Sequence, residues 1–255
     1  MSEKTIIAWT DHTHNIAWGC TKISPGCKNC YADTLSSRYG HHVWGKDAER
    51  RILSDANWLK PMEWNEQAEH EGRRHRVFTS SMCDVFEDHP TIEQERAKLW
   101  DIIRETPNLD WQVLTKRHER IAANLPPDWN GGWDNVWLGV SIETNDYIHR
   151  ADALRQIPAV VRFISYEPAL GPVPDLDLAG IDWLICGGES GPGFRPMPDE
   201  WPRQAKQMCE DAGTAFFFKQ SAASRTEMGI KLDGEIIRNY PTPRTGSHAR
   251  RMQLI

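Results

Sequence analysis

The sequence predicts an α/β fold in which parallel strands form a partial barrel, and two observations support this class. Six short runs are nearly continuously apolar and rich in β-branched or aromatic residues, which is typical of strands buried on both faces. Helix-like segments separate several of these runs, so the pattern indicates βαβ units with right-handed crossovers. The six runs span residues 76–82, 110–116, 135–142, 160–168, 182–190 and 214–220.

One further strand is expected near residues 5–11, which gives six or seven strands in all. That number is too small for a closed eight-stranded barrel but sufficient for a partial one. A doubly wound sheet is the competing architecture. The stretch 125–135 is rich in Trp, Pro and Gly and is expected to be a long loop within one domain.

Helices are predicted at 91–107, 144–158 and 199–213. The first is expected to begin with Thr91 as its N-cap, and Glu93 lies in its first turn, where a negative charge favours the helix dipole. Its apolar residues recur near helical spacing, so one face is expected to pack on the sheet.

Length and charge set limits on the class of protein. The chain has 255 residues and a formal net charge of -6, so it does not attract nucleic acid as a whole. We expect a single domain over residues 1–255, with a polar C-terminal tail from about 240. The polar start and the lack of a long apolar run indicate a cytoplasmic protein that does not contact membranes.

Polar side chains follow the predicted strands at the points where the strands end. In parallel α/β folds, the carboxyl ends of the strands form one face, and sites are built there. We therefore expect a lined cavity at that face. The alternative for its carboxylates is ion pairing with nearby Lys or Arg side chains. The side chains assigned to this cavity are Ser80, Ser81, Asp84, Ser141, Glu143, Glu167, Glu189 and Lys219.

Three of the six cysteines lie within eleven residues, at Cys20, Cys27 and Cys30. Cytosolic thiols are normally reduced, so a disulfide framework is not expected. A zinc site would need a fourth ligand, for which His12 or His14 is available. A [4Fe–4S] cluster held by three thiolates instead keeps one iron open to a small ligand. The residues alone leave both possibilities.

The cysteine segment resembles the cluster loop of the radical S-adenosylmethionine superfamily. Its motifs, in order, are similar to those of an uncharacterised phage-associated three-Cys-motif family, thought to be distantly related to spore photoproduct lyase. The resemblance spans roughly residues 5–240. The motifs are "WTDHTHN…GCTKISPGCKNCYA", "FTSSMCDVF", "VLTKR", "WLGVSIE", "ISYEPALGP", "GGESGPGFRPM" and "FFFKQ".

The resemblance implies a partial (βα)6 TIM-like barrel of the radical S-adenosylmethionine type. It implies that Cys20, Cys27 and Cys30 hold a [4Fe–4S] cluster whose open iron binds S-adenosylmethionine. It also implies cleavage of that cofactor to a 5'-deoxyadenosyl radical, which abstracts a substrate hydrogen. An electron donor such as a flavodoxin or ferredoxin is then expected, and a nucleotide or nucleic acid is the suggested substrate.

Residue roles follow from position and from this resemblance. The superfamily's GGE motif usually follows the second strand and contacts the cofactor's amino group, but here Gly187, Gly188 and Glu189 follow a late strand. That role is therefore given to residues after the second strand. The residues assigned to cofactor binding are Ser80, Ser81, Asp84, Ser141 and Glu143, and those assigned to catalysis are Glu167, Glu189 and Lys219.

Two other classes of function stay open from the residues alone. One is a zinc- or cluster-stabilised protein without catalytic activity that acts in interactions between phage and host. The other is an enzyme that uses the carboxylates of the barrel without radical chemistry. Cys83 follows the second strand and is either a hydrogen-atom donor or, as is more common for a lone cysteine, an inert packed thiol.

Overall fold

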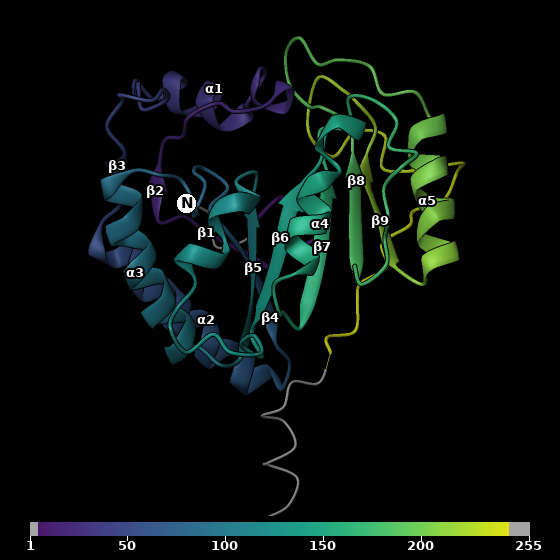
Figure 1. Cartoon of the computed structure of the whole chain (residues 1–255). Coiled ribbons are helices and arrows are strands. Elements are labelled where there is room, and N and C mark those ends of the chain that lie inside the picture. Colours follow the sequence, from purple (N-terminus) through teal and green to yellow (C-terminus); the bar gives the residue numbers. More distant parts are fainter. Residues whose placement is uncertain (1–4, 245–255) are drawn as a thin grey trace, which may run out of the picture.

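The computed structural model describes residues 5–244 and contains a curled sheet of seven parallel strands (Figure 1). The strands pair in the order β1-β4-β5-β6-β7-β8-β9. Their bounds are β1 His12–His14, β4 His75–Thr79, β5 Leu109–Thr115, β6 Val136–Ser141, β7 Val161–Tyr166, β8 Trp183–Gly187 and β9 Ala215–Gln220. This order follows the chain without reversal, which rules out the doubly wound alternative. β1 and β9 form the two edges, so the sheet is an open half-barrel and the predicted α/β class is confirmed.

The first strand does not lie at residues 5–11, where the sequence predicted it. The paired strand is β1, which runs alongside β4 with His12 opposite Val77. The preceding segment turns instead, because the backbone N–H of Thr10 donates to the carbonyl of Ile7 at 3.3 Å. That turn places Trp9 among the aromatic side chains inside the half-barrel.

The predicted helices are present with different bounds. α3 (Pro90–Glu105) begins one residue earlier than predicted, and its N-cap is His89, not Thr91, because the His89 side chain accepts from the backbone N–H of Thr91 at 3.2 Å. The segment after β6 forms a single 3-10 turn and then the short α4 (His149–Arg155), so its helix is shorter than predicted. α5 (Glu200–Ala212) agrees with the prediction.

Two helices and a small ribbon were not predicted. They are α1 (Tyr31–Arg38), α2 (Asp55–Glu71), and the antiparallel pair β2 (Ala17–Trp18) and β3 (Arg51–Ile52). α2 carries Pro61 in its interior, which ordinarily disfavours a helix, and ends where Gly72 adopts a left-handed conformation. In Figure 1, α1 lies above the upper ends of the strands, beside the loop that follows β8.

Two connections lack the α-helix that a strict (βα)6 repeat would contain. Between β5 and β6 the chain forms two short 3-10 turns and then the expected loop over 125–135. Between β7 and β8 it forms an irregular segment that contains Pro168, Pro172 and Pro174. Proline lacks the N–H that a helix interior requires, which accounts for the second gap.

The core is divided by the sheet into two layers. On the outer face, side chains such as Val113, Leu138 and Leu184 pack against the helices, including Leu99 of α3. On the inner face, aromatic side chains form a separate cluster in the lower part of the half-barrel. That cluster contains Trp9, Phe78, Trp137, Phe163, Trp183 and Phe217. The inner cluster fills one end of the half-barrel, which leaves the carboxyl ends of the strands for a site.

Among residues 5–244, no helix has both the length and the apolar character that crossing a bilayer requires.

His14, at the end of β1, is fully buried against three tryptophans. Among the residues that the structure describes, no group accepts from or donates to either of its ring nitrogens. Burial lowers the pKa of His14 from 6.5 to about 3, and the positive charge of Lys60 in α2 acts in the same direction. The imidazole is therefore neutral in the folded protein at neutral pH.

This burial makes stability depend on pH. The unfolded chain binds a proton at His14 below about pH 6.5, whereas the folded chain does so only near pH 3. The free energy of unfolding is expected to fall by about 1.4 kcal/mol per pH unit between these values because of this residue. Urea denaturation between pH 7 and pH 4 measures it. His14→Phe is expected to flatten the slope, and His42→Gln, at an exposed position, is not. Equal slopes for His14→Phe and the parent protein would contradict this assignment.

Candidate functional site

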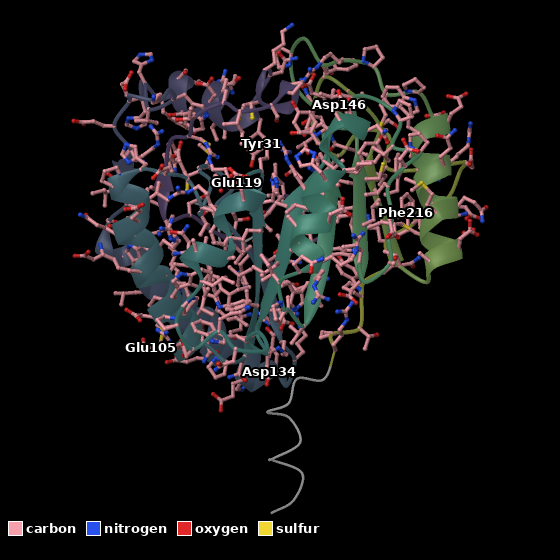
Figure 2. All side chains as sticks on the ribbon, viewed as in Figure 1. Tyr31, Glu105, Glu119, Asp134, Asp146 and Phe216 are labelled. Atoms are coloured by element: carbon pink, nitrogen blue, oxygen red, sulfur yellow. The ribbon has the colours of Figure 1, made fainter. Side chains whose placement is uncertain are left out.

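A cavity of about 1100 Å³ opens at the carboxyl ends of the strands. Figure 2 marks this end: Tyr31, Glu119, which follows β5, and Asp146, which follows β6, lie in the upper part of the molecule, whereas Glu105 and Asp134, which precede β5 and β6, lie at the opposite end. The size is that of a site for a small-molecule ligand. The residues assigned from the sequence that line it are Cys20, Cys27, Cys30, Ser80, Ser81, Asp84, Ser141, Glu167, Glu189 and Lys219.

The three clustered cysteines line this one cavity, are half-buried, and form no disulfide. The Cys27 Sγ lies 3.6 Å from the Ser24 Oγ, and the Cys20 Sγ lies 3.6 Å from a guanidinium nitrogen of Arg117. Burial raises the pKa of the Cys20 thiol, as does the Asp84 carboxylate, whereas Arg117 opposes the rise. Burial also raises the pKa of the Cys30 thiol.

The three thiols match an iron–sulfur cluster in the chemistry of their donor atoms. Three soft sulfur donors from one loop face one cavity, and thiolates are the ordinary ligands of such clusters. Within residues 5–244, no three His, Cys, Asp or Glu side chains are already gathered closely enough to hold a metal ion. In particular, His12 and His14 are not brought to the cysteines: His12 bonds to His75 at 3.0 Å, and His14 lies between tryptophans. Neither of the two histidines offered from the sequence as a fourth zinc ligand therefore lies with the three thiols.

Contacts from distant parts of the chain fasten the loop between Cys20 and Cys30. Glu143, just after β6, is fully buried and accepts from the Ser24 hydroxyl at 2.6 Å. Gly26 packs directly against the same carboxylate, since a Cβ at this position would lie 2.7 Å from the Glu143 side chain. Lys116 and Arg150 each bond to Glu143 at 3.0 Å. Glu143 is not one of the described residues that line the cavity, and it lies behind the loop.

Glu189, after β8, fastens the other half of this loop. Its carboxylate accepts from the Asn29 amide at 2.9 Å and forms a close two-pronged ion pair with Arg195. Arg195 also donates to the Pro25 carbonyl at 3.1 Å. These bonds lower the pKa of Glu189 although burial opposes the shift, so the group is ionised at neutral pH. They join the loop after β8 to the cysteine loop across the mouth of the half-barrel.

Glu167 and Lys219 form the third carboxylate contact. The Lys219 Nζ lies 2.5 Å from the Glu167 Oε1, and both side chains line the cavity. Glu167 directly follows β7 and Lys219 lies in β9, and β8 lies between these two strands in the sheet. The ion pairs of Glu143, Glu167 and Glu189 are those that the sequence offered as the alternative to function. For Glu167 the pair lies in the cavity, so a charged donor and acceptor are available there.

The residues after β4 are held in an unusual geometry. Ser80 is buried and adopts a φ of +70°, which is uncommon for a residue other than glycine and recurs at functional sites. Its side chain lines the cavity. The Ser81 hydroxyl bonds to the Asn15 amide at 3.2 Å, and the Ser81 carbonyl accepts from the Tyr31 hydroxyl at 2.9 Å. Both serines therefore lie at the cavity beside the cysteine loop.

Asp84 and Ser141 differ in how many polar contacts they make with other side chains. The Asp84 carboxylate is ion-paired with Arg117 at 2.9 Å and accepts from the Thr115 hydroxyl at 2.7 Å. Ser141 is buried at the end of β6 and lines the cavity. Cys83 lines the same cavity, and burial raises the pKa of its thiol to about 12, so it keeps its hydrogen at neutral pH.

Sequence reasoning missed the residues that act on the loop from a distance. Arg117 bonds to Asp84 at 2.9 Å, to Glu87 at 3.3 Å and to the Thr21 carbonyl at 2.9 Å, besides its contact with Cys20. Glu87 in turn accepts from the backbone N–H of Thr21 at 2.7 Å. The signal for Arg117 was its position directly after the run that became β5. Nothing in the sequence pairs Asn29 with Glu189, which lies 160 positions away.

Comparison with solved structures finds proteins whose fold is similar to that of this chain. The chain is 12% identical to a single-site mutant of spore photoproduct lyase, with a TM-score of 0.51, and the match covers 80% of this chain and 74% of that one. It is 14% identical to a double mutant of spore photoproduct lyase with bound AdoMet and dinucleoside spore photoproduct, with a TM-score of 0.47. This second match covers 80% of this chain and 62% of that one. At these identities the likeness concerns the fold alone.

Comparison of the sequence with known families covers nearly the whole chain. No curated protein matches it. Residues 4–241 match the family described as "Protein of unknown function (DUF5131)". The match extends over the half-barrel, the cysteine loop and every residue assigned to the cavity. The chain therefore belongs to the DUF5131 family.

Proposed function

We propose that this protein is a radical S-adenosylmethionine enzyme in which Cys20, Cys27 and Cys30 hold a [4Fe–4S] cluster. The observation that carries the proposal is the placement of the three thiols. They belong to one fastened loop and face one cavity at the carboxyl ends of a parallel half-barrel. Three thiolates leave one iron open for the amino and carboxylate groups of S-adenosylmethionine. The half-barrel fold shared with spore photoproduct lyase supports this reading.

When bound, the cluster and the cofactor would supply one-electron cleavage to a 5'-deoxyadenosyl radical that takes a hydrogen atom from the substrate. The protein's own residues would bind, orient and shield these groups. Ser80, Ser81, Asp84 and Ser141 are proposed to bind the cofactor. All four line the cavity, and Ser80 is held in the strained backbone geometry described above. A one-electron donor such as a flavodoxin or ferredoxin is the proposed partner.

Glu167 and Lys219 are the proposed catalytic residues. Their ion pair lies at the cavity wall, so Lys219 can donate a proton and Glu167 can accept one beside a bound substrate. Glu143 and Glu189, which the sequence assigned to cofactor binding and catalysis, have contacts that support a different role. Both bond to residues of the cysteine loop, so we assign them as positioning residues that hold the loop.

Formation of 5'-deoxyadenosine tests this proposal. The full chain, purified without oxygen and reconstituted with iron and sulfide, is incubated with a chemical reductant and S-adenosylmethionine. We expect 5'-deoxyadenosine and methionine, because a reduced cluster can pass an electron to the cofactor on its open iron without a substrate present. A protein with an intact cluster that yields neither product would overturn the proposal. Retention of one zinc without sulfide would instead favour a zinc-stabilised protein without catalytic activity.

A further inference from the structure

Five side chains line one side of the cavity and form what we call the aromatic bay: Trp18, Tyr39, His41, Trp44 and Arg51. They come from β2, the end of α1, the segment that follows α1, and β3. The Trp18 ring centroid lies 6.4 Å from that of Tyr39 and 5.8 Å from that of His41. The guanidinium carbon of Arg51 lies 4.8 Å from the Trp18 ring centroid. Flat π-faces and one guanidinium group thus line this wall.

The bay is held in place next to the first cysteine of the loop. Gly45 donates its backbone N–H to the carbonyl of Cys20 at 3.1 Å. Gly19 adopts a φ of +117°, and a Cβ there would lie 2.3 Å from the carbonyl oxygen of Val43, so the two segments approach more closely than another residue would allow. Buried Arg50 donates to the Val43 and Gly45 carbonyls at 3.2 and 3.1 Å. The wall is therefore fixed before any ligand arrives.

The rings of the bay are more accessible than most aromatic side chains of this protein. Trp18 and Trp44 are half-buried, and Tyr39 is 65% exposed. By contrast, six other tryptophans are buried in the core: Trp9, Trp100, Trp111, Trp129, Trp137 and Trp183. Accessible aromatic faces that gather at the wall of a cavity are typical of a ligand site.

Charge in the cavity indicates the sign of the ligand. The three carboxylates that line it are each ion-paired: Asp84 with Arg117, Glu167 with Lys219, and Glu189 with Arg195. Within residues 5–244, Arg51 has no carboxylate partner, and the same holds for Arg225, which also lines the cavity. A ligand with negative charge would complement the two arginines.

We propose that the aromatic bay binds a planar aromatic group whose anionic substituent pairs with Arg51, which is the chemistry of a nucleotide unit. The base would stack on Trp18, and the phosphate would meet the Arg51 guanidinium. Because the bay adjoins Cys20, the bound unit lies beside the thiols. Its identification as the substrate rests on the function proposed above, but its binding does not. A free nucleotide and a nucleotide within a single strand both present a base and a phosphate, so either could be the source of the bound unit.

Equilibrium dialysis with the full chain tests this, and it needs no cluster. The probes are the four common nucleoside monophosphates, the matching nucleosides, a short single-stranded DNA and S-adenosylmethionine. We expect at least one monophosphate to bind more tightly than its nucleoside. Arg51→Gln is expected to weaken monophosphate binding by about tenfold and to leave nucleoside binding unchanged. Trp18→Leu is expected to weaken both, and Arg38→Gln, at an exposed arginine outside the cavity, neither.

Each outcome decides the proposal. Equal binding of monophosphates by Arg51→Gln and the parent protein would overturn it, as would the absence of binding by all four monophosphates and the DNA. If Trp18→Leu loses S-adenosylmethionine and keeps the nucleotides, the bay belongs to the cofactor and the proposal is wrong. Tighter binding of the DNA than of any monophosphate would identify a strand as the source of the unit. A protein that binds nucleotides through Arg51 but forms no 5'-deoxyadenosine would keep this inference and lose the proposed function.

Discussion

Replacing Cys27 by serine is expected to remove most of the iron and sulfide that the reconstituted protein holds. Cys27 is one of the three clustered thiols that line the cavity, and its loss would leave the cluster with two of its three proposed protein ligands. The rate of 5'-deoxyadenosine formation is expected to fall by more than about 100-fold. Iron and acid-labile sulfide are measured after reconstitution and desalting without oxygen.

Cys209→Ala provides the matched control for this change. Cys209 is buried in α5 and packs in the outer core, away from the cavity, so its loss removes a sulfur without touching the loop. The control is expected to retain the parent content of iron and sulfide. If Cys27→Ser also retained that content and still formed 5'-deoxyadenosine, the loop would not be the site of the cluster.

Glu143→Ala is expected to lower the free energy of unfolding by about 3–5 kcal/mol. Glu143 is fully buried and bonds to the equally buried Arg150, so its removal leaves a charge in the interior without a carboxylate. The same change removes the acceptor of the Ser24 hydroxyl. Backbone amides near Ser24 are therefore expected to exchange hydrogen faster than in the parent protein. Urea denaturation and hydrogen exchange measure the two effects.

Glu119→Ala serves as the comparison. The side chain of Glu119 is 59% exposed and lies 3.1 Å from the His118 ring, and such an exposed contact contributes about 1 kcal/mol or less. A loss for Glu143→Ala no larger than that for Glu119→Ala would show that Glu143 is not the buried anchor described here. Unchanged exchange near Ser24 would remove its role in holding the loop.

The sheet was predictable because its strands are buried on both faces. Continuous apolar runs such as the one around Val113 carry that signal in the sequence itself. The missed helix α2 lacks such a signal, because Pro61 interrupts it and its burial is confined to a few residues. The first strand was displaced because Trp9 enters the inner aromatic cluster instead of pairing with β4. The local sequence pattern thus predicts a strand or helix correctly where packing against distant parts of the chain does not change its position.

The site was predictable only in part. The spacing of the three cysteines and the polar residues at strand ends identified the cavity, since both are local properties of the sequence. The contacts that hold the loop are not local: Ser24 and Glu143 are 119 positions apart, and Asn29 and Glu189 are 160 apart. Only the fold brings these residues together. For this reason the sequence assigned Glu143 to cofactor binding and Glu189 to catalysis, whereas their contacts with the loop led us to propose that they hold it.

The central claim is that three thiolates hold a cluster with one open iron. Electron paramagnetic resonance of the reduced, reconstituted protein tests it most directly, with spectra recorded before and after addition of S-adenosylmethionine. We predict a [4Fe–4S] signal that changes when the cofactor is added, because the cofactor would bind the open iron. A protein that forms no cluster and retains zinc, or a cluster signal that the cofactor leaves unchanged, would contradict the account.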